Sequence, residues 1–259
     1  MNSQNKHNSK KVILLLAIIV ATLSPLPISV LAGEVAPHWQ YGGAENPTQW
    51  GNLSKDFALC ESGRDQSPIN IKNAVESTPA TISFDYKSSP LVVVNNGHTI
   101  QVNYAQGSSV TINGEKYALV QFHFHTPSEH QINGKAAAME LHLVHRNEAG
   151  KLAVVGVMLT KGKANSLIEE VWKNIPATGK TNTVSDLLIN ATSFLPKSKA
   201  YYSYEGSLTT PPCSEGVKWN VFVEPMTISE EQIEAFEKNY QVDARPIQPT
   251  NSRAVQLHH

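Results

Sequence analysis

The feature that most constrains this chain is a pair of histidines two residues apart, His123 and His125, with a third at His142. Side chains alternate between the two faces of a β-strand, so residues two apart point the same way. His123 and His125 then project together, while Phe122 and Phe124 point to the other face. If the segment around His142 forms a neighbouring strand, its imidazole joins the pair. Three neutral imidazoles on a rigid sheet face predict a catalytic zinc site with one position left for water.

The histidine pair alone has a second interpretation, as partly buried and hydrogen-bonded residues of an ordinary strand. Two neighbouring side chains favour the metal. Gln121 lies two residues before His123, and Glu140 lies two before His142, so each shares a strand face with a histidine. A metal-bound imidazole usually gives its other ring N–H to a carboxylate or a carbonyl. Gln121 and Glu140 are therefore predicted to orient ligands, although the spacing does not say which histidine Glu140 serves.

The first 32 residues have the pattern of a secretory signal peptide. Three lysines precede an apolar run at residues 12–23, which is about a dozen residues long and short for a bilayer span. Small residues up to Ala32 predict cleavage after that position. The alternative is an uncleaved membrane anchor. Residues 33–259 are predicted to form one domain, periplasmic or secreted, with no stable membrane insertion after cleavage.

The charge balance and the cysteine content limit the classes of protein further. The formal net charge is −1, and loss of the three leader lysines makes it about −4. The chain has no basic stretch of the kind that would indicate a nucleic-acid partner. It also has no flexible histidine-rich tract of the kind that zinc-buffering proteins use. His258 and His259 are expected to be a disordered tail or a cloning remnant. Cys60 and Cys213 are the only cysteines, and in an exported chain they predict a disulfide, with two free thiols as the alternative.

Strand-like runs dominate the rest of the sequence. Alternating or β-branched patterns predict strands at residues 81–86, 91–94, 99–104, 110–112, 117–124, 139–145 and 152–159. Asn113-Gly114 and Asn133-Gly134 are strong hairpin turn signals. The second turn is predicted to connect the His123 strand to the His142 strand, which would then lie side by side and antiparallel.

Helical signals are fewer. Asn165-Ser166 is predicted to cap a helix over residues 167–174, and Ser229 with Gln232 forms a capping box that opens a helix to about Lys238. The fold class is predicted to be mainly β, with one large mixed sheet and short peripheral helices.

Three segments, 121–130, 140–145 and 206–212, together resemble the α-class carbonic anhydrases, in sequence QFHFHTPSEH, ELHLVH and GSLTTPP. Shorter matches at residues 38–41, 66–70, 95–98 and 217–219 run in the same order, so the resemblance covers about residues 37–253. The leader and the two cysteines are similar to those of the exported bacterial branch. The resemblance implies a twisted, mostly antiparallel sheet of about ten strands.

The resemblance also implies a role for each matched residue. His123, His125 and His142 would be the zinc ligands, oriented by Gln121 and Glu140, the latter on His142. Thr209 would accept a hydrogen bond from zinc-bound hydroxide and donate one to Glu129. His98 would be the proton shuttle. Thr210 would lie beside Thr209 in the cleft, and His130 and His145 would be buried structural histidines. Further matched positions are Tyr41, Asn96 and Gln101 along a water chain, and Val144, Val154, Leu208, Val217 and Trp219 in an apolar wall for carbon dioxide.

Three details of the resemblance concern the backbone, one side chain and the two cysteines. Cis peptide bonds would fall at Ser67-Pro68 and Pro211-Pro212. Gln101 stands where many relatives have asparagine, a change that should be tolerated. A Cys60–Cys213 bridge would pin the loop that bears Thr209.

The implied activity is the zinc-dependent, reversible hydration of carbon dioxide to bicarbonate and a proton. Zinc-bound hydroxide would attack carbon dioxide, and His98 would pass the released proton to solvent. Carbon dioxide, bicarbonate and water are the expected partners. Ester hydrolysis is compatible with the same site as a side reaction. The sequence is also compatible with an oligomer. The alternative is a carbonic anhydrase-like binding protein without catalysis, but such relatives lack one or more of the zinc histidines.

Overall fold

The computed structural model describes residue 1 and residues 37–77 and 81–259. The predicted signal peptide at residues 1–32 lies outside the described residues apart from Met1, so it stays a prediction. Residues 37–259 form one compact unit. Among the described residues, no helix is long and apolar enough to cross a membrane.

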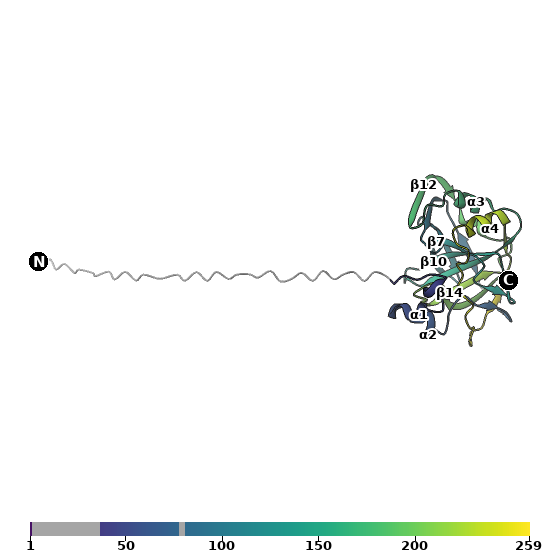
Figure 1. The fold of residues 1–259 in the computed structure, drawn as a ribbon, viewed down its shortest axis with the longest axis horizontal. Helices are drawn as coiled ribbons and strands as arrows, with labels where there is room; N and C mark the ends of the chain where they lie inside the picture. Colours follow the sequence, from purple (N-terminus) through teal and green to yellow (C-terminus); the bar gives the residue numbers. More distant parts are fainter. Residues whose placement is uncertain (2–36, 78–80) are drawn as a thin grey trace. The chain divides into compact units, whose positions relative to one another are not determined.

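A single large sheet of thirteen strands dominates this unit (Figure 1). Its continuous path runs through ten strands in the order β12 (Lys180–Ile189), β4 (Ser89–Asn95), β5 (Ile100–Asn103), β7 (Glu115–His125), β10 (Met139–Arg146), β11 (Leu152–Lys161), β14 (Glu215–Phe222), β13 (Tyr201–Ser207), β16 (Gln256–His258) and β2 (Val75–Glu76). Off this path, β6 (Ser109–Ile112) pairs with β7 and with β3 (Ile82–Asp85), and β15 (Met226–Ile228) pairs with β11.

Most neighbouring strands in the large sheet are antiparallel. The parallel pairs are β11–β14, β11–β15 and β16–β2. A separate small sheet joins β1 (Asn70–Ile71), β8 (Gln131–Ile132) and β9 (Lys135–Ala136). The predicted class, a mainly β fold on a large and mostly antiparallel sheet, is therefore confirmed.

The helices are short, and two of them, α3 and α4, begin where the capping residues predict. The Asn165 side chain accepts the N–H groups of Leu167 and Ile168 at the start of α3 (Ser166–Lys173). Ser229 and Gln232 form the reciprocal capping box that opens α4 (Glu230–Glu237). The sequence did not predict the remaining helices, which are α1 (Trp50–Leu53), α2 (Leu59–Ser62) and the 3₁₀ turns η1 (Gly43–Glu45), η2 (Lys55–Phe57) and η3 (Ala191–Phe194).

One of the two predicted hairpin turns connects different strands from those expected. Asn113-Gly114 joins β6 to β7, with φ of 52° and 81°. Asn133-Gly134 has similar positive φ values, 50° and 78°, but joins β8 to β9. The prediction that it connects the two histidine strands was wrong, because a two-residue turn pairs only the residues that flank it directly, and these form an inserted hairpin. β7 and β10 still pair antiparallel on either side of the insertion.

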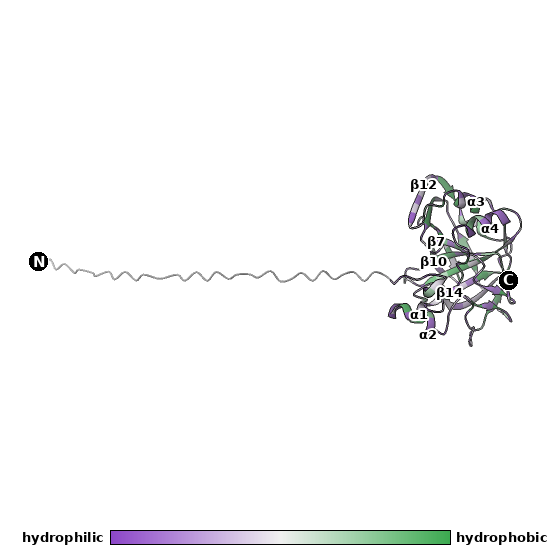
Figure 2. Cartoon of the chain, viewed as in Figure 1, coloured by the Kyte–Doolittle hydropathy of each residue, from purple (hydrophilic) through white to green (hydrophobic). Residues whose placement is uncertain are grey.

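The large sheet separates two apolar clusters, as the alternation along its strands requires. Phe122 and Phe124 of β7 point into the larger cluster, where Phe124 packs against Trp172 of α3 at a ring distance of 4.7 Å. Both helices α3 and α4 contribute to this side. Figure 2 shows apolar colouring concentrated in the central strands. The opposite face of β7, which carries the histidines, is thereby left for a functional site.

The C-terminal histidines correct another expectation. They do not form a disordered tail, because β16 pairs with β13 and β2. His258 is only 4% exposed and stacks on Tyr201, with Ser203 Oγ 2.8 Å from its Nε2 atom. The strand contributes main-chain hydrogen bonds that a disordered tail could not make, so His258 is part of the fold.

Candidate metal centre

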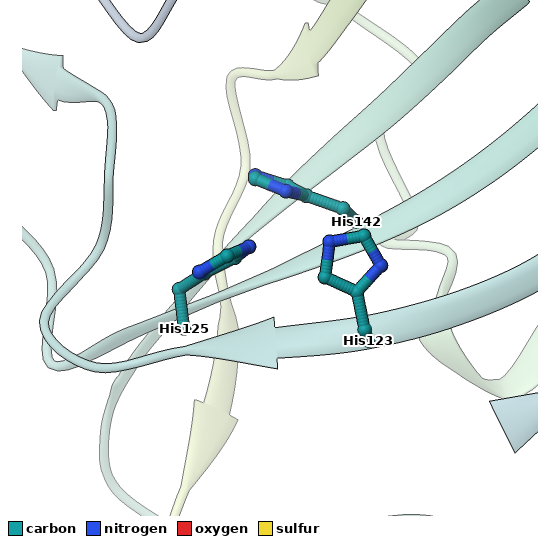
Figure 3. A group of neighbouring side chains, drawn as sticks. All are labelled: His123, His125 and His142. Atoms are coloured by element: carbon teal, nitrogen blue, oxygen red, sulfur yellow. The ribbon is translucent and has the colours of Figure 1, made fainter. Parts of the chain in front are cut away.

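Strand register brings the three histidines together. In the β7–β10 ladder, His142 lies directly opposite His123, and Glu140 lies opposite His125. Directly paired residues share a sheet face. One nitrogen from each of His123, His125 and His142 lies within 4.8 Å of the others, and the three rings point toward a common space (Figure 3).

Hydrogen bonds fix two of the rings so that their Nε2 atoms remain available. His123 Nδ1 lies 2.9 Å from Gln121 Oε1, which can only accept. His125 Nδ1 donates to the main-chain oxygen of Asp243 at 2.7 Å. In both rings Nδ1 therefore carries a proton, and Nε2 is the nitrogen that is unprotonated in the neutral ring. His125 Nε2 is fully buried and has no hydrogen-bond partner within the described chain.

The third ring is placed by Glu140, which is fully buried. Glu140 accepts hydrogen bonds from the N–H and Nδ1 of His130, both at 2.8 Å. His142 Nε2 lies 3.0 Å from Glu140 Oε1, although the ring is not turned for a linear hydrogen bond. This contact leaves Nδ1 as the nitrogen of His142 that could bind a metal. His130 in turn meets the Tyr204 hydroxyl at 2.6 Å through Nε2, so the whole group is buried and connected.

The protonation of the centre follows from its burial and its charges. Burial holds the pKa of His123 well below its usual range and lowers that of His142. Burial also opposes the charged form of His125, but Glu129 and Asp243 outweigh it and raise the pKa of that ring. Burial opposes ionisation of Glu140 as well, yet His130 and His142 keep its pKa well below the usual value. The site therefore combines two imidazoles that burial keeps neutral, His123 and His142, with nearby carboxylates, which suits a cation.

Glu129 is buried beside the histidines. Its Oε1 accepts the Arg245 main-chain N–H at 2.9 Å, while its Oε2 lies 3.5 Å from His125 Nε2 and has no hydrogen-bond partner among the described residues. Thr209 is 5% exposed and makes no hydrogen bond to Glu129 in the described part of the chain. The structure thus leaves one buried acceptor oxygen of Glu129 open.

An apolar row lies next to the histidines. Val144 of β10, Val154 of β11 and Trp219 of β14 are successive partners across the sheet. They belong to one hydrophobic cluster with Val217 and Leu208. The Trp219 ring lies 4.9 Å from that of His142. All five residues predicted for the apolar wall are therefore grouped, and the group reaches the metal centre.

His98 lies apart from the three histidines, at a surface groove of about 600 Å³ that Trp39 and Tyr41 also line. Its ring stacks on Trp39 with centroids 3.7 Å apart, and its Nε2 is 3.0 Å from the Trp39 main-chain oxygen. Burial, followed by the nearby His38, lowers the pKa of His98.

The residues predicted for the water chain occupy different settings. Gln101 is the strand partner of His123 on β5, and its Nε2 donates to Asn103. The Asn96 side-chain Oδ1 closes a local turn by accepting the main-chain N–H groups of His98 and Thr99. Burial and the nearby Glu129 raise the pKa of Tyr41 well above its usual value, so this hydroxyl stays protonated.

Cys60 and Cys213 form the predicted disulfide, with Cα atoms 5.0 Å apart. Cys213 lies four residues beyond Thr209, and its N–H donates to Thr210 O at 2.8 Å. The bridge therefore fixes the end of the Thr209 loop. The peptide bonds before Pro68 and Pro212 are cis, and so is the Thr126-Pro127 bond, which was not predicted.

Sequence reasoning missed three residues of the site. Asp243 and Arg245 act on the site through a main-chain oxygen and a main-chain N–H. Every residue type has the first group and every type except proline has the second, so the residue types did not reveal them. Trp39 was seen within a matched segment, but its stacking on His98 required the tertiary structure.

Comparison with known proteins identifies the family. The sequence profile of the eukaryotic-type carbonic anhydrases matches residues 45–259. The chain belongs to this carbonic anhydrase family. A carbonic anhydrase of Pectobacterium atrosepticum is 42% identical over 84% of this chain and 90% of its own length.

Two solved structures extend the agreement to the fold. A hyperthermostable carbonic anhydrase from a hydrothermal vent chimney is 46% identical, with a TM-score of 0.84 over 86% of this chain and all of its own. The α-carbonic anhydrase of Thermovibrio ammonificans, solved with sulfanilamide, is 43% identical, with a TM-score of 0.82 over the same shares. The family makes this chain a carbonic anhydrase enzyme.

Proposed function

We propose that this chain is a zinc enzyme that hydrates carbon dioxide to bicarbonate and a proton, and that His123, His125 and His142 hold the zinc. The convergence of their three nitrogens within 4.8 Å carries the proposal. The donor set fits zinc, which takes three histidines in catalytic sites and keeps a fourth position open. The buried and unpartnered His125 Nε2 supports a resident cation, since an unsatisfied buried nitrogen is costly.

Zinc bound here would act as a Lewis acid that lowers the pKa of a water from 15.7 to about 7, an effect for which carbonic anhydrase is itself the standard example. The residues around the triad have separate tasks. Gln121, Asp243 O and Glu140 hold the imidazoles in the tautomer that leaves the central nitrogens free. Without them the rings could turn or take up protons.

The apolar wall would place the substrate. Carbon dioxide has no net charge or dipole, so an apolar surface can hold it without competing for the water that must react with it. Val144, Val154 and Trp219 form such a surface across three adjacent strands, next to His142. Leu208, Val217 and Thr210 would complete it. Orientation of this kind lowers the barrier by confining the reactants to a productive geometry.

Thr209 and Glu129 would orient the nucleophile. Glu129 Oε2 is a buried acceptor without a partner among the described residues, and a hydrogen bond donated by the Thr209 hydroxyl would satisfy it. Thr209 Oγ1 would then have no proton left to give and could only accept. A water or hydroxide at the centre would have to donate its proton toward Thr209, which turns a lone pair toward carbon dioxide.

His98 would carry the released proton out. The Trp39 carbonyl can only accept, so His98 Nε2 holds a proton and Nδ1 is free to accept one. A lowered pKa keeps this ring neutral near neutral pH and ready to receive. Tyr41, Asn96 and Gln101 would order the waters between the centre and His98.

We also propose that residues 1–32 direct export and are removed, so that the enzyme acts in the periplasm or outside the cell. The Cys60–Cys213 disulfide supports this proposal, because such bonds persist in oxidising compartments.

The test is zinc analysis and stopped-flow carbon dioxide hydration on the purified chain that starts at Gly33. We expect about one zinc per chain and hydration that is lost with dipicolinate and restored with zinc. Sulfanilamide, which the Thermovibrio enzyme holds in its solved structure, should inhibit both hydration and any ester hydrolysis. A zinc-loaded chain that does not hydrate carbon dioxide would instead support the non-catalytic binding protein.

A further inference from the structure

Arg245 is a buried arginine whose guanidinium no step above has used. It is 2% exposed, and its guanidinium makes no ion pair with a described carboxylate. Instead it donates to three neutral oxygens, Gln66 Oε1 at 2.9 Å, Ser67 O at 2.8 Å and Cys60 O at 2.8 Å. Burial lowers the pKa of Arg245 to about 10, so it remains charged at neutral pH. The charge interacts with Glu129 only at longer range and lies over the Trp50 ring at 5.9 Å. Burying a charge without a direct ion pair is costly, so its position calls for a function.

The main chain of the same residue holds Glu129. The Arg245 N–H donates to Glu129 Oε1 at 2.9 Å. This bond fixes the carboxylate so that Oε2 is left open beside the metal centre. The position of one half of the proposed Thr209–Glu129 pair therefore depends on where Arg245 lies.

The side chain of Arg245 reaches the other half of that pair through Gln66. Gln66 accepts from the guanidinium through Oε1 and donates through Nε2 to Cys213 O at 3.0 Å. Cys213 ends the Thr209 loop and is bonded to Cys60, whose carbonyl Arg245 also binds. One guanidinium thus connects to both main-chain ends of the disulfide.

The start of the same loop is tied to Ser67, another partner of Arg245. Ser67 N donates to Ser207 Oγ at 2.9 Å, and Ser207 N donates to Ser67 Oγ at 3.1 Å. The packing is close, since a Cβ atom on Gly206 would lie 2.2 Å from Ser67 Oγ. Both ends of the segment that carries Thr209 are therefore anchored to groups that Arg245 binds.

We propose that Arg245 is a positioning residue for carbon dioxide hydration, which sets the spacing between Thr209 and Glu129 by holding the carboxylate with its main chain and the loop with its guanidinium. This inference rests on the proposed function. It assigns no contact with substrate or metal to Arg245. Its effect is on the orientation of the nucleophile, so it should appear in kcat rather than in zinc binding or in KM.

The experiment compares wild type with Arg245→Lys and Arg253→Lys, all zinc-loaded and assayed well below their melting temperatures. Lysine keeps the charge at position 245 but cannot reach three acceptors at once. We expect kcat to fall about 10- to 100-fold, with KM and zinc content unchanged. Arg253 is the matched control: it also binds main-chain oxygens, of Gln66 and Glu205, but neither Glu129 nor a disulfide residue. Arg253→Lys should lose stability and keep kcat.

A second comparison separates positioning from general stability. In a Cys60→Ser/Cys213→Ser background the loop is already released, so Arg245→Lys should reduce kcat by a much smaller factor than in wild type. Gln66→Met cuts the connection to Cys213 while the other acceptors of Arg245 remain, and should lower kcat about threefold or more. Gln66→Met carries the test if Arg245→Lys does not fold.

An active, zinc-loaded wild type with an equally active Arg245→Lys, or an unchanged kcat in Gln66→Met, would overturn the inference alone. Equal losses of kcat in Arg245→Lys and Arg253→Lys would also overturn it, as would full additivity with the disulfide variant. A zinc-loaded wild type without hydration would overturn the proposed function and this inference with it.

Discussion

Removing the Cys60–Cys213 disulfide should lower the melting temperature strongly. The two cysteines are 153 residues apart, so the bridge closes a loop that spans most of the described chain. In the chain-entropy model, a loop of this length raises the free energy of unfolding by about 5 kcal/mol, because it restricts the unfolded ensemble. For a domain of this size, each kcal/mol corresponds to about 2–4 °C. The expected decrease is about 10–20 °C.

The disulfide is buried among Trp50 and Phe57, so a reductant reaches it slowly and variants are the better probe. Calorimetry should compare wild type, Cys60→Ser, and Cys60→Ser/Cys213→Ser, each with zinc bound. The single and double variants should lose the same amount, since the link itself and not either sulfur limits the unfolded chain. A double variant that melts within about 3 °C of wild type would refute the loop-closure argument.

Three further outcomes are expected. His142→Ala should lose both zinc and hydration, and a full equivalent of zinc by elemental analysis would contradict its role as a ligand. His98→Ala should slow turnover about tenfold or more, with partial recovery in imidazole buffer, and an unchanged rate in weak buffer would remove His98 from the mechanism. Burial lowers the pKa of His145 to about 4, so the unfolded chain binds a proton that the folded chain refuses. The contribution of His145 to the free energy of unfolding should therefore be fully present above about pH 6.5, and up to about 3 kcal/mol of it should be lost as the pH falls toward 4. Urea midpoints that do not change between about pH 6.5 and 4 would contradict the lowered pKa of His145.

The strands that carry the three histidines could be predicted because the alternation of side chains along a strand shows which residues share a face. Alternation placed His123 and His125 together, and the apolar pattern of residues 139–145 supplied a neighbouring strand for His142. The pairing of these strands was predicted correctly, although for a partly wrong reason. Asn133-Gly134 does form a turn, but it closes the inserted β8–β9 hairpin. A local turn signal gives the conformation of two residues and says nothing about how far the flanking strands extend.

The parts that could not be predicted depend on main-chain atoms or on distant packing. Asp243 holds His125 through a carbonyl, and Arg245 holds Glu129 through an N–H. His258 was expected in a disordered tail because strand pairing at a chain end leaves little trace in three residues. Its burial depends on β13 and β2, which are remote in sequence.

The same distinction explains where this enzyme keeps its rigidity. The three histidines come from two paired strands, so sheet register alone sets their spacing. Thr209 lies in a loop, where no ladder of hydrogen bonds fixes it, yet the orienting role proposed for it needs comparable precision. The ends of this loop are held by a disulfide, the reciprocal Ser67–Ser207 hydrogen bonds and a buried guanidinium. Sequence patterns therefore predict the part of the site built on strands, whereas the part built on a loop depends on long-range contacts that only the folded structure contains.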